Sequence, residues 1–595
     1  MPTASKKKVI VVGGGLAGLA CTIKLAEEGV AVDLFSMVPV KRSHSVCAQG
    51  GINACNDIAR QQGYSEWMHF DETVLGGDFL ADQPPVFEMT QWAPKIIDLL
   101  DRMGVPFNRT PEGERALRLF GGSLFKRTFF AGATTGQQLL YALDEQTRRW
   151  ESEGKVHKYE FWEFLWPVIH DGQCVGIVAQ DMRTMQIRSF RADAVVMATG
   201  GNGLIFGKST MSVICTGGAV SRCYQVGAKY GNPEMIQVHP TAIPGEDKCR
   251  VISESARGEG GRVWVPRIAG DKRPIKQIPD SDRWYFLEEW YPKYGNLVPR
   301  DVATRAIHKV VYEQGLGIDG LPMVYLDLTH IDRATLDRKL GGILEIYEKF
   351  VGVDPHIEPM KIFPGMHYTM GGLWVDFNQM TNIPGIFAAG ECEYQYHGAN
   401  RLGANSLVSC IFGGFKAGPN ALQYAKSVPA QAADGGHAAE ITRQSEINKK
   451  LMNNEGTENP FKLWRELGVT TTKHATVIRY NKGLEEADAK IVELLDRFKK
   501  VNLSDRSQWA NTSFAFARQL KNMLELSRCV VRGAILRDES RGAHYKPDFP
   551  DRNDERFLKT TKASFTGECS GPRFEYEDVD IQYIPPRARR YDAAK

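Results

Sequence analysis

A histidine, His44, stands in the segment KRSHSVCAQGG, residues 41–51, directly ahead of a Gly-Gly pair and downstream of a glycine-rich turn. Glycines are expected beside a turn that binds phosphate, but an imidazole is not. On residue type alone, the simplest interpretation is a hydrogen bond made within a tight loop. The alternative is that the imidazole carries chemistry, which requires a ligand bound beside the turn.

The glycine-rich turn lies between a strand of apolar, β-branched residues, 9–12, and a helical segment rich in alanine and leucine. Gly13, Gly15 and Gly18 form the G-x-G-x-x-G pattern in this context, which favours a dinucleotide with its pyrophosphate at the helix N-terminus. Ser36 ends the second strand, where a ribose-binding acid is expected in an NAD-binding chain. The pattern therefore favours FAD over NAD.

Two more apolar strands end in glycine far along the chain, in ADAVVMATGG (192–201) and IPGIFAAGECE (383–393). They predict a sheet that begins near the N-terminus, is interrupted and later resumes. We expect an α/β fold in which an FAD-binding Rossmann-like domain is interrupted by an α+β capping domain and followed by a helical domain and a C-terminal tail. The expected ranges are 1–246 and 366–430 for the FAD-binding domain, 247–365 for the capping domain, 443–545 for the helical domain and 546–595 for the C-terminal extension.

Residues 427–442 are small, polar and glycine-containing, and we interpret them as a linker. Beyond them, apolar residues recur with the helical period in two segments, Leu484, Ala487, Ile491, Leu494 and Phe498, and Leu520, Leu524, Val531 and Ile535. The charge-dense segment RDESRGAH, 537–544, indicates ion pairs between domains rather than catalysis. From about Lys546 the chain is rich in proline and charge, which predicts a tail on the surface.

The composition is that of a globular protein, with 43% hydrophobic and 24% charged residues. A net charge of +3 gives no support to nucleic-acid binding. The eleven cysteines include no CxxC pair, which excludes the thiolate clusters of iron–sulfur centres and structural zinc, so we predict no metal site. No apolar run is long enough to cross a bilayer.

Several motifs follow one another in a fixed order: RSHSVCAQGGI, QVHPTAIPG, SESARGEGGRVW, NLVPRDVATRAI, MHYTMGGLWVD, AAGECEYQYHGANRLGANSL and RDESRGAHY. Through them the chain resembles the flavoprotein subunits of succinate dehydrogenase and fumarate reductase over nearly its whole length. The stretch WYFLEEWYPKYGNLVPRD is most similar to the bacterial branch with a dihaem membrane anchor. The resemblance implies FAD-dependent oxidation of succinate to fumarate, or the reverse reaction, with a quinone as electron partner.

In that family the histidine of the RSH motif is bonded covalently to FAD, and His44 is the matching position. Such a bond would prevent dissociation of the flavin and favour its reduced form. Many relatives carry Asp in a TGDG segment where this chain reads TGGA, with Gly218 in place of the acid. The further residues implied to bind FAD are Gly13, Gly15, Gly18, Ser36, Gln49, Gly51, Glu391, Arg401 and Ser406.

The resemblance also implies a site for a dicarboxylate dianion, which needs cationic or donor groups at both ends. Arg401 and His367 match the ligands of one carboxylate, and His239 and Ser253 match those of the other. Relatives usually carry Thr at the position of Ser253, so the hydroxyl is retained. Phe120 matches a residue that closes over the substrate.

Proton transfer is implied for Arg300, with Glu254 and Arg257 as its relay. Arginine is an unusual acid–base group because its free pKa exceeds about 12. From residue types alone, an ion pair between Arg300 and Glu254 that joins two domains is the simpler interpretation. The complete set of motifs favours the catalytic one.

The resemblance implies two partner subunits, an iron–sulfur protein docked on an exposed apolar patch and a cytochrome b membrane anchor with quinone. The chain would then lie peripherally on the cytoplasmic face of the bacterial inner membrane.

One alternative is a soluble flavin oxidase resembling L-aspartate oxidase, a family without the tethering histidine, so His44 argues against it. Another is a non-catalytic flavin carrier, against which the complete set of Arg401, His367, His239 and Arg300 argues. Both reaction directions use the same residues.

Overall fold

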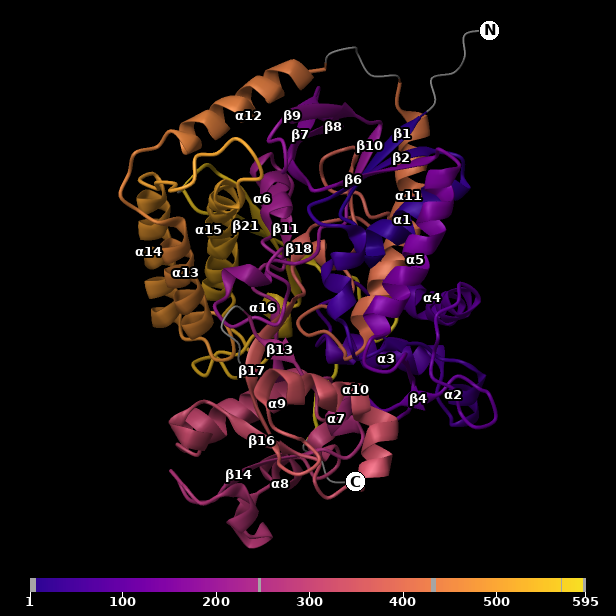
Figure 1. Cartoon of the computed structure of the whole chain (residues 1–595), viewed down its shortest axis with the longest axis vertical. Coiled ribbons are helices and arrows are strands. Elements are labelled where there is room, and N and C mark those ends of the chain that lie inside the picture. Colours follow the sequence, from indigo (N-terminus) through magenta and orange to yellow (C-terminus); the bar gives the residue numbers. More distant parts are fainter. Residues whose placement is uncertain (1–6, 244–247, 430–434, 569, 592–595) are drawn as a thin grey trace.

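The computed structural model describes residues 7–243, 248–429, 435–568 and 570–591. Five parallel strands form one sheet (Figure 1), in the order β19-β10-β1-β2-β6. Strands β10 and β19 come from the two distant strand-to-glycine segments, which confirms the predicted α/β fold with an interrupted sheet. The bounds are β1 Lys8–Val12, β2 Ala31–Ser36, β6 Val156–Glu160, β10 Ala194–Met197 and β19 Ile386–Ala388.

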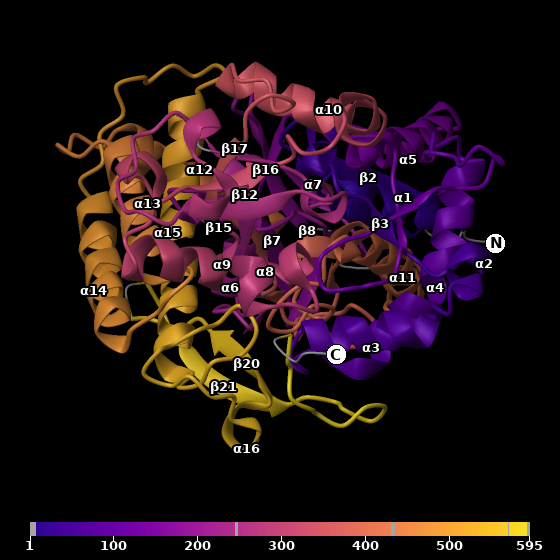
Figure 2. The same cartoon turned by 90° about the horizontal axis from the view of Figure 1, so that it is seen from below.

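Both faces of this sheet are covered, which explains why β1 is apolar throughout. Val9 and Val11 belong to a core shared with helices α1 (Leu16–Glu27), α5 (Thr135–Ser152) and α11 (Asn405–Ser427). Ile10 and Val12 belong to a second core shared with the antiparallel sheet of β7 (Trp162–His170), β8 (Gln173–Asp181) and β9 (Ile187–Arg191). Figure 2 shows further helices beside the helical layer, α2 Asp57–Gln61, α3 Glu66–Gly76 and α4 Gln83–Arg102. A small separate sheet contains the short strands β3 Ile52–Asn53, β4 Leu117–Arg118 and β5 Thr128–Phe129.

A six-stranded sheet, in the order β13-β12-β17-β16-β14-β15, forms the lower part of the molecule in Figure 1. Its long strand β17 runs across the position where we expected the capping domain to end, and its partner β12 ends at Ile243, before the expected beginning at 247, so the pair joins that unit to the FAD-binding part. The strands are β12 Ile236–Ile243, β13 Arg250–Val251, β14 Arg262–Pro266, β15 Arg283–Trp284, β16 Val324–Asp327 and β17 Met360–Thr369. The helices are α7 Ser255–Gly258, α8 Phe286–Trp290, α9 Arg300–His308 and α10 Arg333–Val351.

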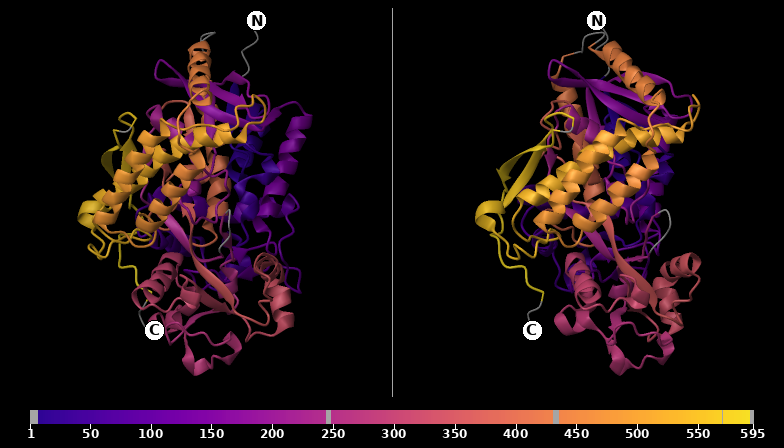
Figure 3. Two further views of the ribbon diagram at one scale, coloured as in Figure 1. Left: turned by 60° about the vertical axis from the view of Figure 1, so that its left-hand side comes forward. Right: turned by 90° about the vertical axis from the view of Figure 1, so that its left-hand side faces the viewer.

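Helices α13 (Pro460–His474), α14 (Asn481–Phe498) and α15 (Thr512–Leu536) pack side by side (Figure 3), whereas α12 (His437–Met452) lies against the sheet of β7, β8 and β9. The predicted apolar faces of α14 and α15 form their common core. The predicted linker, 427–442, was wrong at its end, because α12 begins at His437 after Gly436, whose φ is 85°. The alanine, glutamate and glutamine residues of α12 favour a helix, although the start of this segment has the small and polar composition of a linker. Residues 430–434 of that linker lie outside the described ranges.

The C-terminal stretch lies largely on the surface, as predicted, but it also contributes strands to a sheet. After α16 (Asp554–Phe557), β20 (Lys559–Ser564) and β21 (Arg573–Asp578) complete a sheet with β11 (Tyr230–Gly231) and β18 (Gly372–Leu373). Farther on, Arg589 forms a two-bond ion pair with Asp301 of α9, at 2.5 and 2.9 Å. Among the described residues, no helix combines the length and apolar character that a membrane crossing needs.

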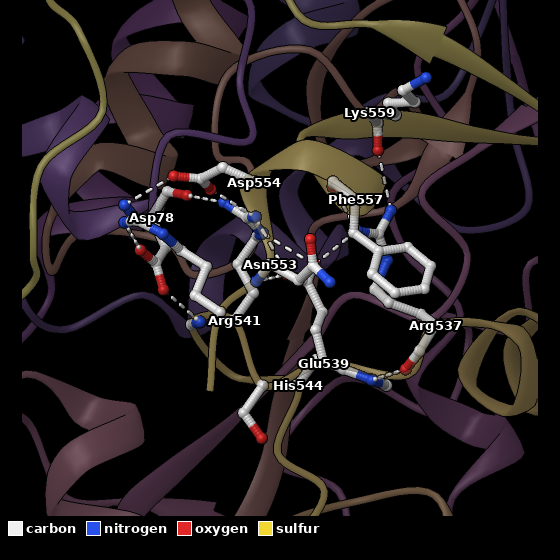
Figure 4. Close-up of polar contacts among 12 residues, drawn as sticks. Asp78, Arg537, Glu539, Arg541, His544, Asn553, Asp554, Phe557 and Lys559 are labelled. Carbon is white, nitrogen blue, oxygen red and sulfur yellow. Dashed lines mark hydrogen bonds and ion pairs between the residues drawn. The ribbon is translucent and has the colours of Figure 1, made fainter. Parts of the chain in front are cut away.

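The RDESRGAH segment forms a buried chain of ion pairs, which confirms the prediction (Figure 4). Arg537 Nη1 and Arg541 Nε each lie 2.8 Å from Glu539 Oε1. Arg537 also pairs with Glu234 at 2.6 Å, and Arg541 with Asp554 at 2.8 Å. The segment thus joins the end of α15 to the residues just before β12, through Glu234, and to the C-terminal elements, through Asp554.

We expect Glu539→Gln to lower the apparent midpoint of thermal unfolding, measured at a fixed scan rate. The substitution leaves two buried guanidinium groups short of a counter-charge, which costs about 3–5 kcal/mol. Glu345→Gln is the matched control, because its pair with Lys349 is exposed and contributes about 0.5 kcal/mol or less. Equal midpoints for the two variants would contradict the expectation.

Protons are bound differently by the folded and unfolded chain because many titratable groups are withdrawn from water. Loss of solvation lowers the pKa of several imidazoles that are buried or line the cavity described below: His44, His69, His239, His367, His397 and His544. Burial raises the pKa of half as many carboxyls, Asp82, Glu391 and Glu393. An imidazole with a lowered folded pKa contributes stability that is complete above the unfolded pKa and is lost as the pH falls below it. The three acids act in the opposite sense and are outnumbered.

We therefore expect the free energy of unfolding to decrease as the pH falls from about 6.5 towards about 4.5, before ordinary carboxylates titrate. Unfolding midpoints measured over a pH series test this. His69→Gln should reduce the dependence of the free energy of unfolding on pH by up to about 1.4 kcal/mol per pH unit, because the pKa of His69 is lowered to about 4. A midpoint that stays level or rises on acidification would show that the imidazoles do not dominate.

Candidate functional site

One cavity opens where the carboxyl ends of the parallel strands meet the capping sheet, and its walls come from residues far apart in the chain. Nearly all of the predicted site residues line it. They are Gly13, Gly15, Ser36, His44, Gln49, Gly51, Phe120, His239, Ser253, Glu254, Arg300, His367, Glu391, Arg401 and Ser406.

The two remaining predicted residues act from behind the wall. Gly18 lets α1 pack on the turn, because a Cβ there would lie 1.8 Å from Gly13 O. Arg257 lies behind Glu254 and donates to its Oε1 at 2.7 Å. Gly13 has a φ of 119°, and a Cβ there would lie 2.0 Å from Ala198 O. Both the backbone conformation and the close approach of Ala198 therefore require glycine at this position.

Four polar atoms of residues in the cavity wall are buried without a hydrogen-bond partner: Ser43 Oγ, Gln49 Oε1, Thr199 Oγ1 and Arg401 Nε. Unpaired buried polar atoms are costly, so their position around one cavity indicates a polar ligand that pairs with them. A bare glycine turn at a helix N-terminus lies in the same wall, as the pyrophosphate of a dinucleotide requires. These residues fit FAD.

His44 is held in this wall by the backbone of a distant segment. Its Nδ1 accepts a hydrogen bond from the Ser212 N–H at 3.2 Å. Burial first, and the charge of Lys248 second, lower the pKa of His44 to about 4, so the ring is neutral at neutral pH. With Nδ1 acting as acceptor, Nε2 carries the proton and is the ring atom available for a further bond.

At the capping end of the cavity, side chains with hydrogen-bond donors surround a common space. The rings of His239 and His367 lie 4.8 Å apart, centroid to centroid. Burial and nearby arginines hold the pKa of both histidines well below 6.5, so both rings are neutral donors. Arg401 stacks over Tyr368 at 4.3 Å, and Ser253 Oγ accepts from Ser255 Oγ at 2.7 Å, which leaves its own hydrogen free to donate.

Arg300, the first residue of α9, is fixed by two side chains. Its Nε and Nη2 both lie 2.9 Å from Glu254 Oε2, and its Nη1 donates to Gln237 Oε1 at 3.0 Å. Burial opposes the charge on Glu254, but Arg300 and Arg257 outweigh it and hold its pKa below the usual value. The buried guanidinium is therefore oriented by two hydrogen bonds and a further ion-pair contact.

Gln237 was not among the predicted site residues. Its Nε2 donates to Asn400 Oδ1 at 2.8 Å and to Arg401 O at 2.7 Å, so it ties Arg300 to the segment that carries Arg401. A signal was available, because alternate residues of a strand share a face and Gln237 precedes His239 by two positions in β12. Gln519 of α15 also lines the cavity and had no such signal.

Phe120 closes the cavity over the glycine pair that follows His44. A Cβ on Gly50 would lie 2.6 Å from Phe120 Cζ, so ring and backbone are in close contact. Phe120 is only 1% exposed. In the described ranges, no group of three or more His, Cys, Asp or Glu side chains is arranged to hold a metal ion.

Comparison with known proteins adds independent information. The FAD binding domain model matches residues 8–407, and the model for the fumarate reductase flavoprotein C-terminal domain matches residues 464–591. The chain is 59% identical to the succinate dehydrogenase flavoprotein subunit of Bacillus subtilis over 595 residues, covering 99% of both chains. It is 34% identical to the fumarate reductase flavoprotein subunit of Escherichia coli, covering 98% of this chain and 95% of that one.

Solved structures agree with the sequence comparison. A mutant of the flavoprotein FrdA from E. coli quinol fumarate reductase superimposes with a TM-score of 0.90 at 32% identity, covering 99% of both chains. Sdh1 of Mycobacterium smegmatis, solved with UQ1, gives a TM-score of 0.83 at 27% identity, covering 98% and 96%. With the cavity and its donors in place, these likenesses show that the chain belongs to the FAD-dependent flavoprotein subunits of the succinate dehydrogenase and fumarate reductase family.

Proposed function

We propose that this chain oxidises succinate to fumarate as the catalytic flavoprotein subunit of a succinate:quinone oxidoreductase, with FAD bonded covalently to His44. The observation that carries the proposal is the charge at the capping end of the cavity. Three buried guanidinium groups, Arg257, Arg300 and Arg401, face the carboxylate of Glu254 and leave two positive charges. A succinate dianion matches that excess.

The other titratable side chains that line this end of the cavity do not change the balance at neutral pH, and Lys248, which acts on His367 from outside the lining, adds to the positive charge. His239 and His367 are neutral. Burial lowers the pKa of Arg401 only to about 9, so it stays a cation, and burial raises the pKa of Glu391 to about 8, so it stays largely protonated. The excess of positive charge is buried and therefore needs an anionic ligand.

The chain's residues divide the work of dehydrogenation. Bound FAD supplies a hydride acceptor for one methylene carbon of succinate. Arg300 would first pass a proton to Glu254 and then take the proton from the neighbouring carbon, while Arg257 would stabilise the charge along this relay. His367 and Arg401 would hold one carboxylate, and His239 with Ser253 the other.

The neutral ring of His44 supports the covalent bond to FAD. Its Nδ1 is engaged with Ser212, so a bond through Nε2 would leave that hydrogen bond in place. A rival oxidase resembling L-aspartate oxidase has no role for this histidine. The bond would retain the flavin and raise its tendency to accept electrons.

Electrons must then leave through other subunits. We propose an iron–sulfur protein as the immediate partner and a cytochrome b anchor with quinone beyond it, on the cytoplasmic face of the bacterial inner membrane. Solved relatives are described with menaquinol and with UQ1, which supports a quinone-linked assembly. The apolar docking patch stays a prediction.

Fumarate reduction by the same residues is the second candidate. Identity of 59% to a succinate dehydrogenase subunit, against 34% to a fumarate reductase subunit, favours oxidation. Electrochemistry of the purified complex with its native quinone would decide the direction.

We expect the peptide that contains His44 to carry the mass of FAD in an active preparation, and the denatured chain to show flavin fluorescence on a gel. His44→Ser should abolish both signals and reduce succinate oxidation more than fumarate reduction, because the unlinked flavin is a weaker oxidant. His356→Gln, outside the cavity, is the control and should keep both signals. An unmodified His44 peptide from active wild-type protein would refute the covalent bond.

We expect Arg300→Lys to lower kcat for succinate-dependent dye reduction by about 10²–10⁴-fold while the flavin content stays unchanged. A lysine cannot contact Glu254 through two nitrogens and Gln237 through a third. Arg305→Lys in the same helix is the control, because Arg305 does not line the cavity. A kcat within about tenfold of the wild-type value would exclude Arg300 from proton transfer.

A further inference from the structure

The helical domain places one side chain in the wall of the FAD cavity. Gln519, on α15, lines the cavity next to Gly218, the first residue of α6 (Gly218–Gln225). A Cβ built on Gly218 would lie 1.7 Å from Gln519 Oε1. The carboxamide of Gln519 therefore occupies the space that a side chain at position 218 would take.

This carboxamide is held in a defined orientation. Its Oε1 accepts a hydrogen bond from Thr216 Oγ1 at 2.8 Å, and its Nε2 donates to Glu163 Oε1. Glu163 is fixed in turn by ion pairs with Arg222, at 2.8 Å, and with Arg518. Gln519 is 3% exposed.

The Gln519 carboxamide can form further hydrogen bonds. A carboxamide has two acceptor positions on oxygen and two hydrogens on nitrogen, and the protein uses one of each. One acceptor position and one N–H remain at the cavity wall. They suit a ligand with hydroxyl groups or ring nitrogens.

The sheet indicates which part of FAD lies there. The pyrophosphate of a dinucleotide lies over the turn after β1, and its adenosine extends towards the end of β2. Phe35, the penultimate residue of β2, packs edge-on against Trp162 at 6.2 Å, and Trp162 directly precedes Glu163. The carboxamide of Gln519, bonded to Glu163, therefore lies towards the adenosine side of the cavity.

We propose that Gln519 is an FAD-binding residue supplied by the helical domain, which hydrogen-bonds the adenosine half of the cofactor in the space left open by Gly218. The proposal rests on FAD binding in this cavity and is independent of the covalent bond and of the direction of the reaction.

The test uses the full chain with the substitution His44→Ser, so that flavin binds reversibly whether or not the wild-type chain is covalently linked. Dissociation constants for FAD and for FMN, which lacks the adenosine, are measured by quenching of flavin fluorescence. Gln519→Leu should weaken FAD binding by about tenfold, the equivalent of about 1.4 kcal/mol, and leave FMN binding within about twofold.

Asn522→Leu is the matched control on α15. Asn522 accepts a hydrogen bond from Gln225 of α6 at 2.9 Å, so it joins the same two helices, but it does not line the cavity. This variant should leave FAD affinity unchanged. An equal loss of FAD affinity in Asn522→Leu would show that helix docking, not contact with FAD, is responsible, and would overturn the proposal.

Gly218→Ala provides a second, independent variant should Gln519→Leu fail to fold. It keeps every polar side chain and fits the helical backbone, yet its methyl group must displace the carboxamide. It should also weaken FAD binding without affecting FMN. Unchanged FAD affinity in either folded variant, or an equal loss for FMN, would refute a role at the adenosine half.

Discussion

A single buried carboxylate, Glu254, organises the reactive end of this molecule. It accepts hydrogen bonds from Arg300 and from Arg257, and its charge keeps two guanidinium groups close together away from water. Removal of such a carboxylate would leave buried cations unpaired, at a cost larger than that of most single interactions in the protein. The position of α9, the orientation of Arg300 and the shape of the cavity all depend on this cluster.

The same cluster supports the proposed binding of a dianion inside the protein rather than on its surface. Its positive excess exists before the ligand arrives, in a cavity where charges interact strongly. The two neutral histidines and Ser253 add donors without adding charge. Gln237 connects the cluster to the segment of Arg401, so the proposed proton-transfer residue and one proposed ligand of the substrate are positioned by one hydrogen-bonded unit.

Three parts of the chain meet around the cofactor cavity. The FAD-binding part supplies the glycine turn and His44, the capping part supplies donors that we propose bind the substrate, and α15 supplies Gln519. The C-terminal segment strengthens this arrangement, because Arg589 pairs with Asp301, the residue after Arg300. The Arg537, Glu539 and Arg541 ion pairs fix the base of α15 against the same body. The site is therefore built at a junction whose parts are held by buried charge.

The sequence by itself determined the local features: the strand, the bare glycine turn and the helix after it, the apolar faces of α14 and α15, and the side chains in the recurring motifs. Those features depend on residues close together in the chain, where spacing and side-chain chemistry are sufficient. Only the tertiary structure decided that Gln237 orients Arg300, that Gln519 occupies the place beside Gly218, and that the predicted tail adds two strands to a sheet. Each of these is a contact between segments tens or hundreds of residues apart, and such contacts follow from packing and buried hydrogen bonds that no local pattern encodes.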